Sequence, residues 1–187
     1  MNVCLIGDGL ISLTLAKTLI NKKIKVFMYY ENNRKIPNDN RTIGISSDNL
    51  DFIQKKIVKI NKNLIWEINK IEIYNDLNTK EKILNFQQSN KRLFSVIKNN
   101  DLYKLLINNF KKNNKFKKIK IKNKSFYSKI LNNQKFDLVI NCDGNNEIST
   151  RYFYQKIIKD YVSTAYVTII NHNKINNKEA IQIFTKH

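Results

Sequence analysis

Residues 2–12 read NVCLIGDGLIS. A short apolar run ends at Gly7, which is the pattern of a buried parallel strand followed by a sharp turn. From residue 10 to residue 21 apolar residues recur at helical spacing, and residues 25–30 form a second run rich in β-forming residues. The sequence therefore predicts a strand–helix–strand unit that begins a doubly wound α/β sheet.

The turn between the first strand and the helix has the glycine spacing of a dinucleotide-binding loop. Gly7 permits the sharp turn, and the missing side chain at Gly9 lets a pyrophosphate approach the helix N-terminus. Ser12 occupies the third, small position of the motif, where Gly or Ala is usual. Glu31 follows the second strand, where a carboxylate accepts hydrogen bonds from ribose hydroxyls and disfavours a 2′-phosphate. The residues expected to bind the dinucleotide are Gly7, Gly9, Leu10, Ile11, Ser12 and Glu31.

Charge alone would suggest another class of protein. The chain has 187 residues and a net charge of +19, which ordinarily indicates a nucleic-acid or anionic-membrane partner. However, 30 of the 34 basic residues are Lys, and Asn also occurs 30 times, which is the composition that A/T-rich codons supply. We interpret much of the charge as compositional bias and expect no specific nucleic-acid partner. A basic module that binds nucleic acid or an anionic membrane stays open as an alternative.

The scarce residue types argue against several kinds of site. Cys4 and Cys142 cannot form a disulfide framework and lack metal-ligand spacing. His172 and His187 have no metal-binding neighbours, so no metal site is expected. No window approaches the roughly 18 consecutive apolar residues of a membrane span. No catalytic residue can be assigned from acid–base or nucleophile motifs. We expect a cytoplasmic protein, with peripheral binding at the inner face of the membrane or association with a multi-enzyme complex as options.

Periodicity predicts further elements along the chain. A polar loop is expected at 32–40, and a helix at 47–60 with Ser47 or Asp48 as its N-cap. The other expected elements are a helix at 99–110 and strands at 68–74, 116–121, 125–130 (paired with 116–121), 136–141, 161–171 and 180–185.

Four segments in series carry a family resemblance. After the glycine turn come DNRTIGIS at 39–46, DLVINCDG at 137–144, YVSTAYV at 161–167, and then His172 and EAIQIFT at 179–185. In this order they resemble the motifs of the aromatic-ring hydroxylases of the flavoprotein monooxygenase group. The closest resemblance is to the ubiquinone-biosynthesis hydroxylases, and it covers nearly the whole chain.

The resemblance implies a cofactor and a reaction. The family binds FAD and uses NAD(P)H and O₂ to hydroxylate an aromatic ring, here that of a polyprenylated phenol. It implies that Arg41 lies near the pyrophosphate or the flavin edge. It also implies that Asp143 and Gly144 lie near the ribityl chain and the pyrophosphate.

The chain departs from the family at three places. Lys23 stands where the family often has a glycine before the second strand. Glu147 and Thr150 stand where the family has Ser and Arg, and Arg151 is one residue late. The family also has a later Gly-Asp segment that this sequence lacks, so we expect only the amino-terminal part of such a protein. The expected fold is α/β, with a Rossmann-like FAD-binding domain at 1–75 and 99–155. Parts of a β-rich substrate-side sheet are expected at 76–98 and 156–187.

An NAD(P)-dependent Rossmann oxidoreductase is the alternative enzyme. It would use the same first strand–helix–strand unit, and its third strand would follow at about residues 39–46. Asp143 and Gly144 distinguish the two hypotheses, because a plain NAD domain does not need them.

Overall fold

The chain folds into two compact units. The computed structural model describes residues 1–31, 41–75, 82–87, 91–122, 126–152, 159–170, 173 and 177–184. The first unit comprises Met1–Asn38 and Leu102–Val167, and the second unit comprises Asp39–Asp101 and Thr168–His187. The loop expected at 32–40 lies outside the described residues.

Among its described residues, the first unit contains four strands and four helices. They are β1 (Asn2–Ile6), α1 (Leu10–Asn21), β2 (Lys25–Tyr30), α3 (Asn99–Asn108, of which residues from 102 onward belong here), β8 (Phe116–Lys120), α4 (Phe126–Leu131), β9 (Leu138–Asn141) and α5 (Glu147–Tyr152). The strands form one parallel sheet in the order β8-β2-β1-β9. The parallel sheet and the strand–helix–strand start predicted from the sequence are confirmed.

Apolar side chains cover one face of this sheet. Successive residues of β1 point to opposite faces, so Val3 and Leu5 share a face. Helix α1 packs against β1 and β2. Its residues Leu13 and Ala16 are fully buried, as are Val3 and Leu5. The apolar residues that recur at helical spacing in the sequence therefore form the buried face of α1.

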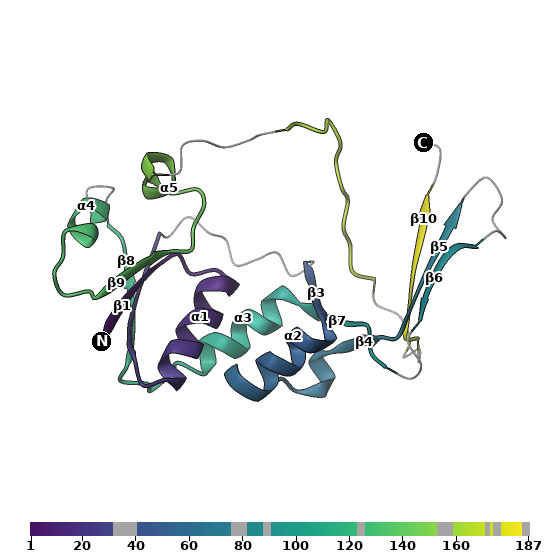
Figure 1. Ribbon diagram of the computed structural model, residues 1–187, viewed down its shortest axis with the longest axis horizontal. Coiled ribbons are helices and arrows are strands. Elements are labelled where there is room, and N and C mark those ends of the chain that lie inside the picture. Colours follow the sequence, from purple (N-terminus) through teal and green to yellow (C-terminus); the bar gives the residue numbers. More distant parts are fainter. Residues whose placement is uncertain are drawn as a thin grey trace. The chain divides into compact units, whose positions relative to one another are not determined.

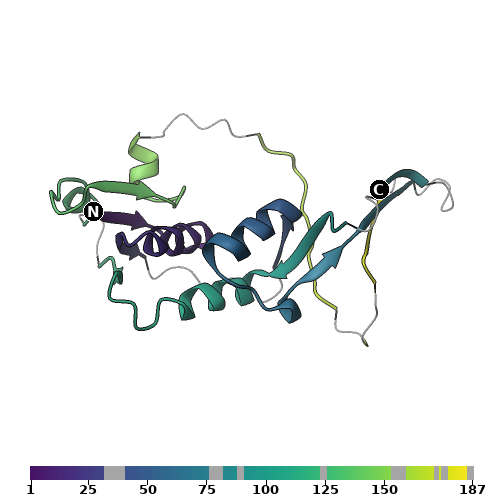
Figure 2. The same cartoon turned by 60° about the horizontal axis from the view of Figure 1, so that its bottom comes forward.

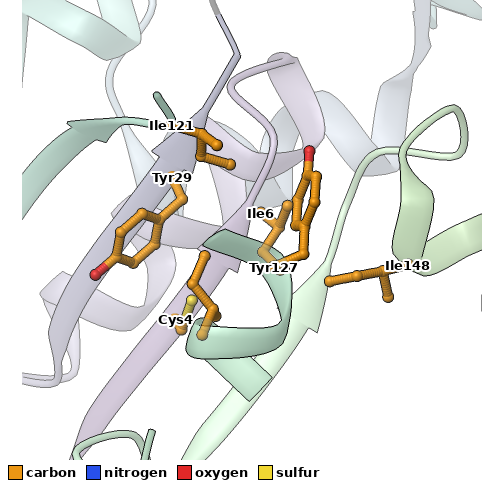
Figure 3. Close-up of a cluster of buried hydrophobic side chains, with 7 residues drawn as sticks. Cys4, Ile6, Tyr29, Ile121, Tyr127 and Ile148 are labelled. Carbon is orange, nitrogen blue, oxygen red and sulfur yellow. The ribbon is translucent and has the colours of Figure 1, made fainter. Parts of the chain in front are cut away.

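The opposite face of the sheet is covered by α4. Cys4 and Ile6 of β1 pack with Tyr127 and Ile130 of α4 in a buried cluster (Figure 3). The other buried members of this cluster are Tyr29, Ile121 and Ile148. Because helices lie on both faces, β1, β2 and β9 have nearly continuous apolar runs rather than alternating ones.

The second unit contains two small sheets. Its elements are β3 (Thr42–Ser46), α2 (Ser47–Phe52), a π-helical turn (Ile53–Ile57), a 3₁₀ turn (Lys62–Leu64), β4 (Trp66–Ile68), β5 (Lys70–Asn75), β6 (Lys82–Gln87), β7 (Phe94–Lys98) and β10 (Glu179–Phe184). One sheet is antiparallel, in the order β3-β7-β4. In the other, β5 pairs antiparallel with β6 and parallel with β10, so segments far apart in the sequence lie side by side (Figures 1 and 2).

A buried carboxylate lies on the second of these sheets. Glu72 of β5 is 5% exposed. Its side chain lies 2.8 Å from Lys70 Nζ and 2.5 Å from Lys82 Nζ, and it accepts a 2.6 Å hydrogen bond from the hydroxyl of Tyr74. These hydrogen bonds, with that from Lys70 the largest, lower the pKa of Glu72 from 4.5 to about 2. The network joins β5 to β6 through charge as well as through backbone pairing.

Three expected elements differ from the structure. Residues 126–131 form helix α4, not a strand paired with β8, because Phe126, Tyr127 and Ile130 together bury one helical face. The helix expected at 47–60 has Ser46 as its N-cap and passes into a π-helical turn that ends at Ile57.

The third difference is the strand expected at 161–171. Residues 161–170 form no strand, and the side chains of Tyr161, Val162 and Tyr166 are exposed. A strand needs a hydrogen-bonded neighbour, and the described residues supply none at this segment.

None of the described helices is long and apolar enough to cross a membrane.

Candidate functional site

Two turns meet at the carboxyl ends of adjacent strands of the parallel sheet. β1 and β9 are neighbours, with Ile6 paired to Asn141 at their carboxyl ends. From β1 the chain continues to β2 and β8 on one side, whereas β9 lies on the other side. The strand order therefore reverses between β1 and β9. Ligands of open α/β sheets bind outside the carboxyl ends of the strands at such a point.

Gly7 forms the first of these turns. Its backbone has φ +106°, a conformation that residues with a side chain rarely adopt. A Cβ atom at this position would lie 3.2 Å from Cβ of Asp143 and 3.4 Å from Oγ of Ser12. The amide of Gly7 donates a 2.8 Å hydrogen bond to the carbonyl of Tyr29. Both the turn and the close approach of Asp143 thus require glycine.

The N-terminus of α1 opens toward this turn. Gly9 is the N-cap residue and supplies no side chain to cap the helix. Ser12 is fully buried, and its hydroxyl has no hydrogen-bond partner among the residues that the structure describes. Ile11 is 73% exposed, and Leu10 is partly buried. An uncapped helix N-terminus beside a glycine turn is suited to hold a phosphate group.

Glu31 follows β2 and has a partner that the sequence does not reveal. The hydroxyl of Tyr127, on α4, donates a hydrogen bond to Oε1 of Glu31. Tyr127 is 4% exposed, and burial followed by the hydrogen bond to Glu31 raises its pKa well above 10. The phenol therefore stays protonated at neutral pH and orients the carboxylate of Glu31.

The second turn, at Asp143 and Gly144, is held by a side-chain network. The amides of Asn141 and Asn146 pair reciprocally, at 3.1 Å and 2.7 Å. Asn141 Oδ1 also accepts from the backbone N–H of Asp143 at 3.2 Å, and the hydroxyl of Ser149 donates to the carbonyl of Asp143 at 2.7 Å. Both backbone groups of Asp143 are thus tied down, which determines how its side chain approaches Gly7.

The expected site residues divide between the two units. Gly7, Gly9, Leu10, Ile11, Ser12, Glu31, Asp143 and Gly144 all belong to the first unit. Arg41 belongs to the second unit, where its carbonyl accepts a 2.9 Å hydrogen bond from the amide of Asn99. A role for Arg41 at the cofactor stays a prediction. Asp39 and Asn40, which precede it in the motif, lie outside the described residues.

The cysteines have structural roles. Cys4 is fully buried, and burial raises the pKa of its thiol to about 12, so it is unreactive at neutral pH. The backbone N–H of Cys142 donates to the carbonyl of Ile6 at 2.9 Å and continues the pairing of β1 with β9. The described residues contain no group of three His, Cys, Asp or Glu side chains that could hold a metal ion.

The features of this edge fit the ADP part of a dinucleotide. The glycine turn leaves room that a Cβ would fill. Within the described part of the chain, no side chain caps the first turn of α1 and the buried hydroxyl of Ser12 lacks a partner. A carboxylate follows the adjacent strand at Glu31. These are the groups that bind a pyrophosphate and an adenosine ribose in the Rossmann arrangement.

The fold is similar to part of the fold of flavoprotein monooxygenases. One such structure is PqsL from Pseudomonas aeruginosa, described as a probable FAD-dependent monooxygenase, with TM-score 0.51 and 15% identity over 64% of this chain and 32% of that chain. PqsL in complex with 2-aminobenzoylacetate gives TM-score 0.52 and 14% identity, over 64% of this chain and 33% of that chain. The p-nitrophenol 4-monooxygenase PnpA from Pseudomonas putida DLL-E4 gives TM-score 0.53 and 10% identity, over 63% of this chain and 31% of that chain.

The likeness concerns fold, not sequence. This chain spans about a third of the length of those structures. No protein-family model and no curated protein matches the sequence. By its fold the chain resembles a class of enzymes, and FAD is the cofactor in the description of PqsL.

Proposed function

We propose that this chain is the FAD-binding part of an aromatic-ring monooxygenase. The observation that carries the proposal is the meeting of two turns at the strand-order reversal, Gly7 after β1 and Asp143 after β9. A plain NAD domain needs only the first turn. Its third strand would also follow β2 directly, whereas in this chain β3 pairs antiparallel in the second unit and β8 is the strand beside β2. The arrangement therefore supports FAD over NAD.

Each site residue has a role in this proposal. The amides at the start of α1, at Leu10, Ile11 and Ser12, bind the pyrophosphate, and the glycines give it access. Glu31, oriented by Tyr127, accepts from the adenosine ribose. Asp143 and Gly144 face the pyrophosphate and ribityl chain from the β9 side. The family resemblance implies a further role at the cofactor for Arg41, a planar cation suited to phosphate or to an electron-rich ring.

The reaction is oxidation of a small aromatic substrate. Bound FAD would supply the redox chemistry, in which two electrons from NAD(P)H reduce O₂, one oxygen atom enters the ring and the other leaves as water. The protein binds and orients the cofactor at the strand ends, and no acid–base residue of this chain is required for that task. For this reason no catalytic residue is assigned.

The proposed substrate is a polyprenylated phenol of ubiquinone biosynthesis. The support is the series of four sequence motifs, of which 137–144 ends in the turn that approaches Gly7. The ligand in the PqsL complex, 2-aminobenzoylacetate, is likewise an aromatic compound. In this proposal the second unit, with its sheets of β3-β7-β4 and β10-β5-β6, provides part of the substrate side. This chain spans about a third of the length of the similar structure of PqsL. Turnover is therefore proposed for a whole protein that contains this part.

Equilibrium titration tests this proposal. Purified chain is titrated with FAD and, separately, with NADH, and binding is followed by quenching of tryptophan or flavin fluorescence. We expect FAD to bind more tightly than NADH. Glu31→Gln should weaken FAD binding about tenfold, because a charged acceptor is replaced by a neutral one. Glu67→Gln, a glutamate of the second unit, is the control and should leave binding unchanged. Tighter binding of NADH than of FAD would favour the oxidoreductase alternative.

A further inference from the structure

An acidic residue lies within the proposed phosphate-binding turn. Asp8 stands between Gly7 and Gly9, and only 14% of its side chain is exposed. A carboxylate at this position repels the two negative charges of a pyrophosphate, and at low exposure the repulsion is poorly screened by water. The proposed function therefore requires that something offset the charge of Asp8.

Lys118 lies against this carboxylate. Its Nζ is 2.9 Å from Oδ2 of Asp8, although the two residues are 110 positions apart in the sequence. Lys118 is in β8, and its side chain is 27% exposed. The same Nζ lies 3.4 Å from the hydroxyl of Tyr103 and 4.3 Å from the centre of the Tyr30 ring. Contacts from the turn, from α3 and from β2 thus hold the lysine in place.

The lysine is charged in this setting. Burial disfavours the ammonium form, but the hydrogen bond to Asp8 and the charge of Asp8 outweigh it, so the pKa of Lys118 is raised above 10.5. The aromatic face of Tyr30 adds a favourable cation–π contact. Asp8 and Lys118 therefore form an ion pair at neutral pH.

We propose that Lys118 is a positioning residue for the cofactor pyrophosphate: by pairing with Asp8 it neutralises the turn and draws the carboxylate toward β8. This inference rests on the proposed FAD site and adds to it a residue from β8, the edge strand beside β2. Lys118 acts through Asp8, since its ammonium group is already engaged by the carboxylate, the Tyr103 hydroxyl and the Tyr30 ring.

A double-mutant cycle tests the inference. The variants are Lys118→Met, Asp8→Asn and the double variant, with Lys117→Met as a control that removes a neighbouring exposed lysine of the same strand. Lys118→Met leaves the carboxylate uncompensated and should weaken FAD binding about tenfold. Asp8→Asn is close to isosteric, leaves the lysine free to attract phosphate and should tighten binding. The double variant should bind within about threefold of the wild type, and Lys117→Met should bind like the wild type.

The outcomes separate this inference from the proposed function. The defect of Lys118→Met should also shrink in high salt, which loss of a purely structural residue would not produce. Rescue by Asp8→Asn in the double variant supports the inference. Wild-type affinity in Lys118→Met, weaker binding in Asp8→Asn, or a double variant as weak as Lys118→Met would overturn it while FAD binding by the wild type still stands. If the wild-type chain binds no FAD, the proposed function fails and this inference fails with it. Urea denaturation of each variant checks that it is folded.

Discussion

Gly7 and Asp143 come from the two separate segments of the chain that form the first unit, and they meet at one point. Gly7 is easily identified from its motif, because a strand, two glycines and a helix follow one another in order. Asp143 and Gly144 were expected from a second motif. Their proximity to Gly7 follows from the pairing of β1 with β9. Of the residues that orient this site, Asn141 lies within the motif at 137–144. Tyr127 and Lys118 belong to no motif, and they contact partners 96 and 110 positions away.

A methyl group at Gly7 should disturb this contact. Gly7→Ala places a Cβ 3.2 Å from Cβ of Asp143 in a backbone conformation with φ +106°. We expect a loss of about 1–3 kcal/mol in the free energy of unfolding, measured by urea denaturation, together with loss of FAD binding. Gly44→Ala is the matched control. Its Cβ would make ordinary contact with the ring of Phe94 at 3.5 Å, and its stability should equal or exceed that of the wild type. Equal stability of both variants would contradict the description of the turn.

The network at Asn141 should matter for stability and for cofactor binding. Asn141→Ala removes the partner of the Asn146 amide and of the Asp143 backbone N–H. Because Asn146 is 6% exposed, its unpaired amide should cost about 2–3 kcal/mol, measured by urea denaturation. FAD binding should weaken in the same variant. Asn145→Ala, in the same turn but exposed, should change stability by less than about 0.5 kcal/mol. A similar effect of the two substitutions would be evidence against the network.

At the scale of elements, strongly patterned segments were predictable and weakly patterned ones were not. β1, α1 and β2 have the bounds expected from their apolar runs. Residues 126–131 contain a mixture of apolar and polar side chains that suits either a short strand or a short helix, and packing on the sheet selects the helix. Residues 161–170 have a strand-like composition without a strand partner among the described residues, so composition alone predicted the wrong state.

The sheet of β5, β6 and β10 should depend on pH through Glu72. Its pKa is about 2 in the folded chain against 4.5 unfolded, so the unfolded chain binds more protons between these values. The stabilisation is fully present above pH 4.5 and is lost as the pH falls toward 2. The free energy of unfolding, measured by urea denaturation, should therefore fall as the pH is lowered over this range. The fall should be smaller in Glu72→Gln. The control Glu67→Gln should retain the fall of the wild type, and an identical pH profile in wild type and Glu72→Gln would exclude this role.

At the scale of the whole molecule, the sequence predicted the class of fold but not the order of its strands. The apolar runs do not indicate that β8 and β9 lie at opposite edges of the sheet, with β1 and β2 between them. This order depends on which helix covers which face, and that depends on packing across the whole unit. Residues 41–75 were expected in the FAD-binding domain, and they pack within the second unit. The functional boundary between a cofactor side and a substrate side stays a proposal, because a compact unit need not coincide with one function.

The central claim is that this chain binds the ADP half of FAD at the turn of Gly7. The most direct measurement compares the dissociation constants of FAD and riboflavin for the wild-type chain by fluorescence titration, with ADP as a competitor. Riboflavin has the flavin ring and ribityl chain but lacks the pyrophosphate and adenosine, which the glycine turn, the α1 N-terminus and Glu31 would bind. The account predicts that FAD binds at least about tenfold more tightly than riboflavin and that ADP displaces it. Equal affinity for the two flavins, or no binding of FAD at all, would contradict it.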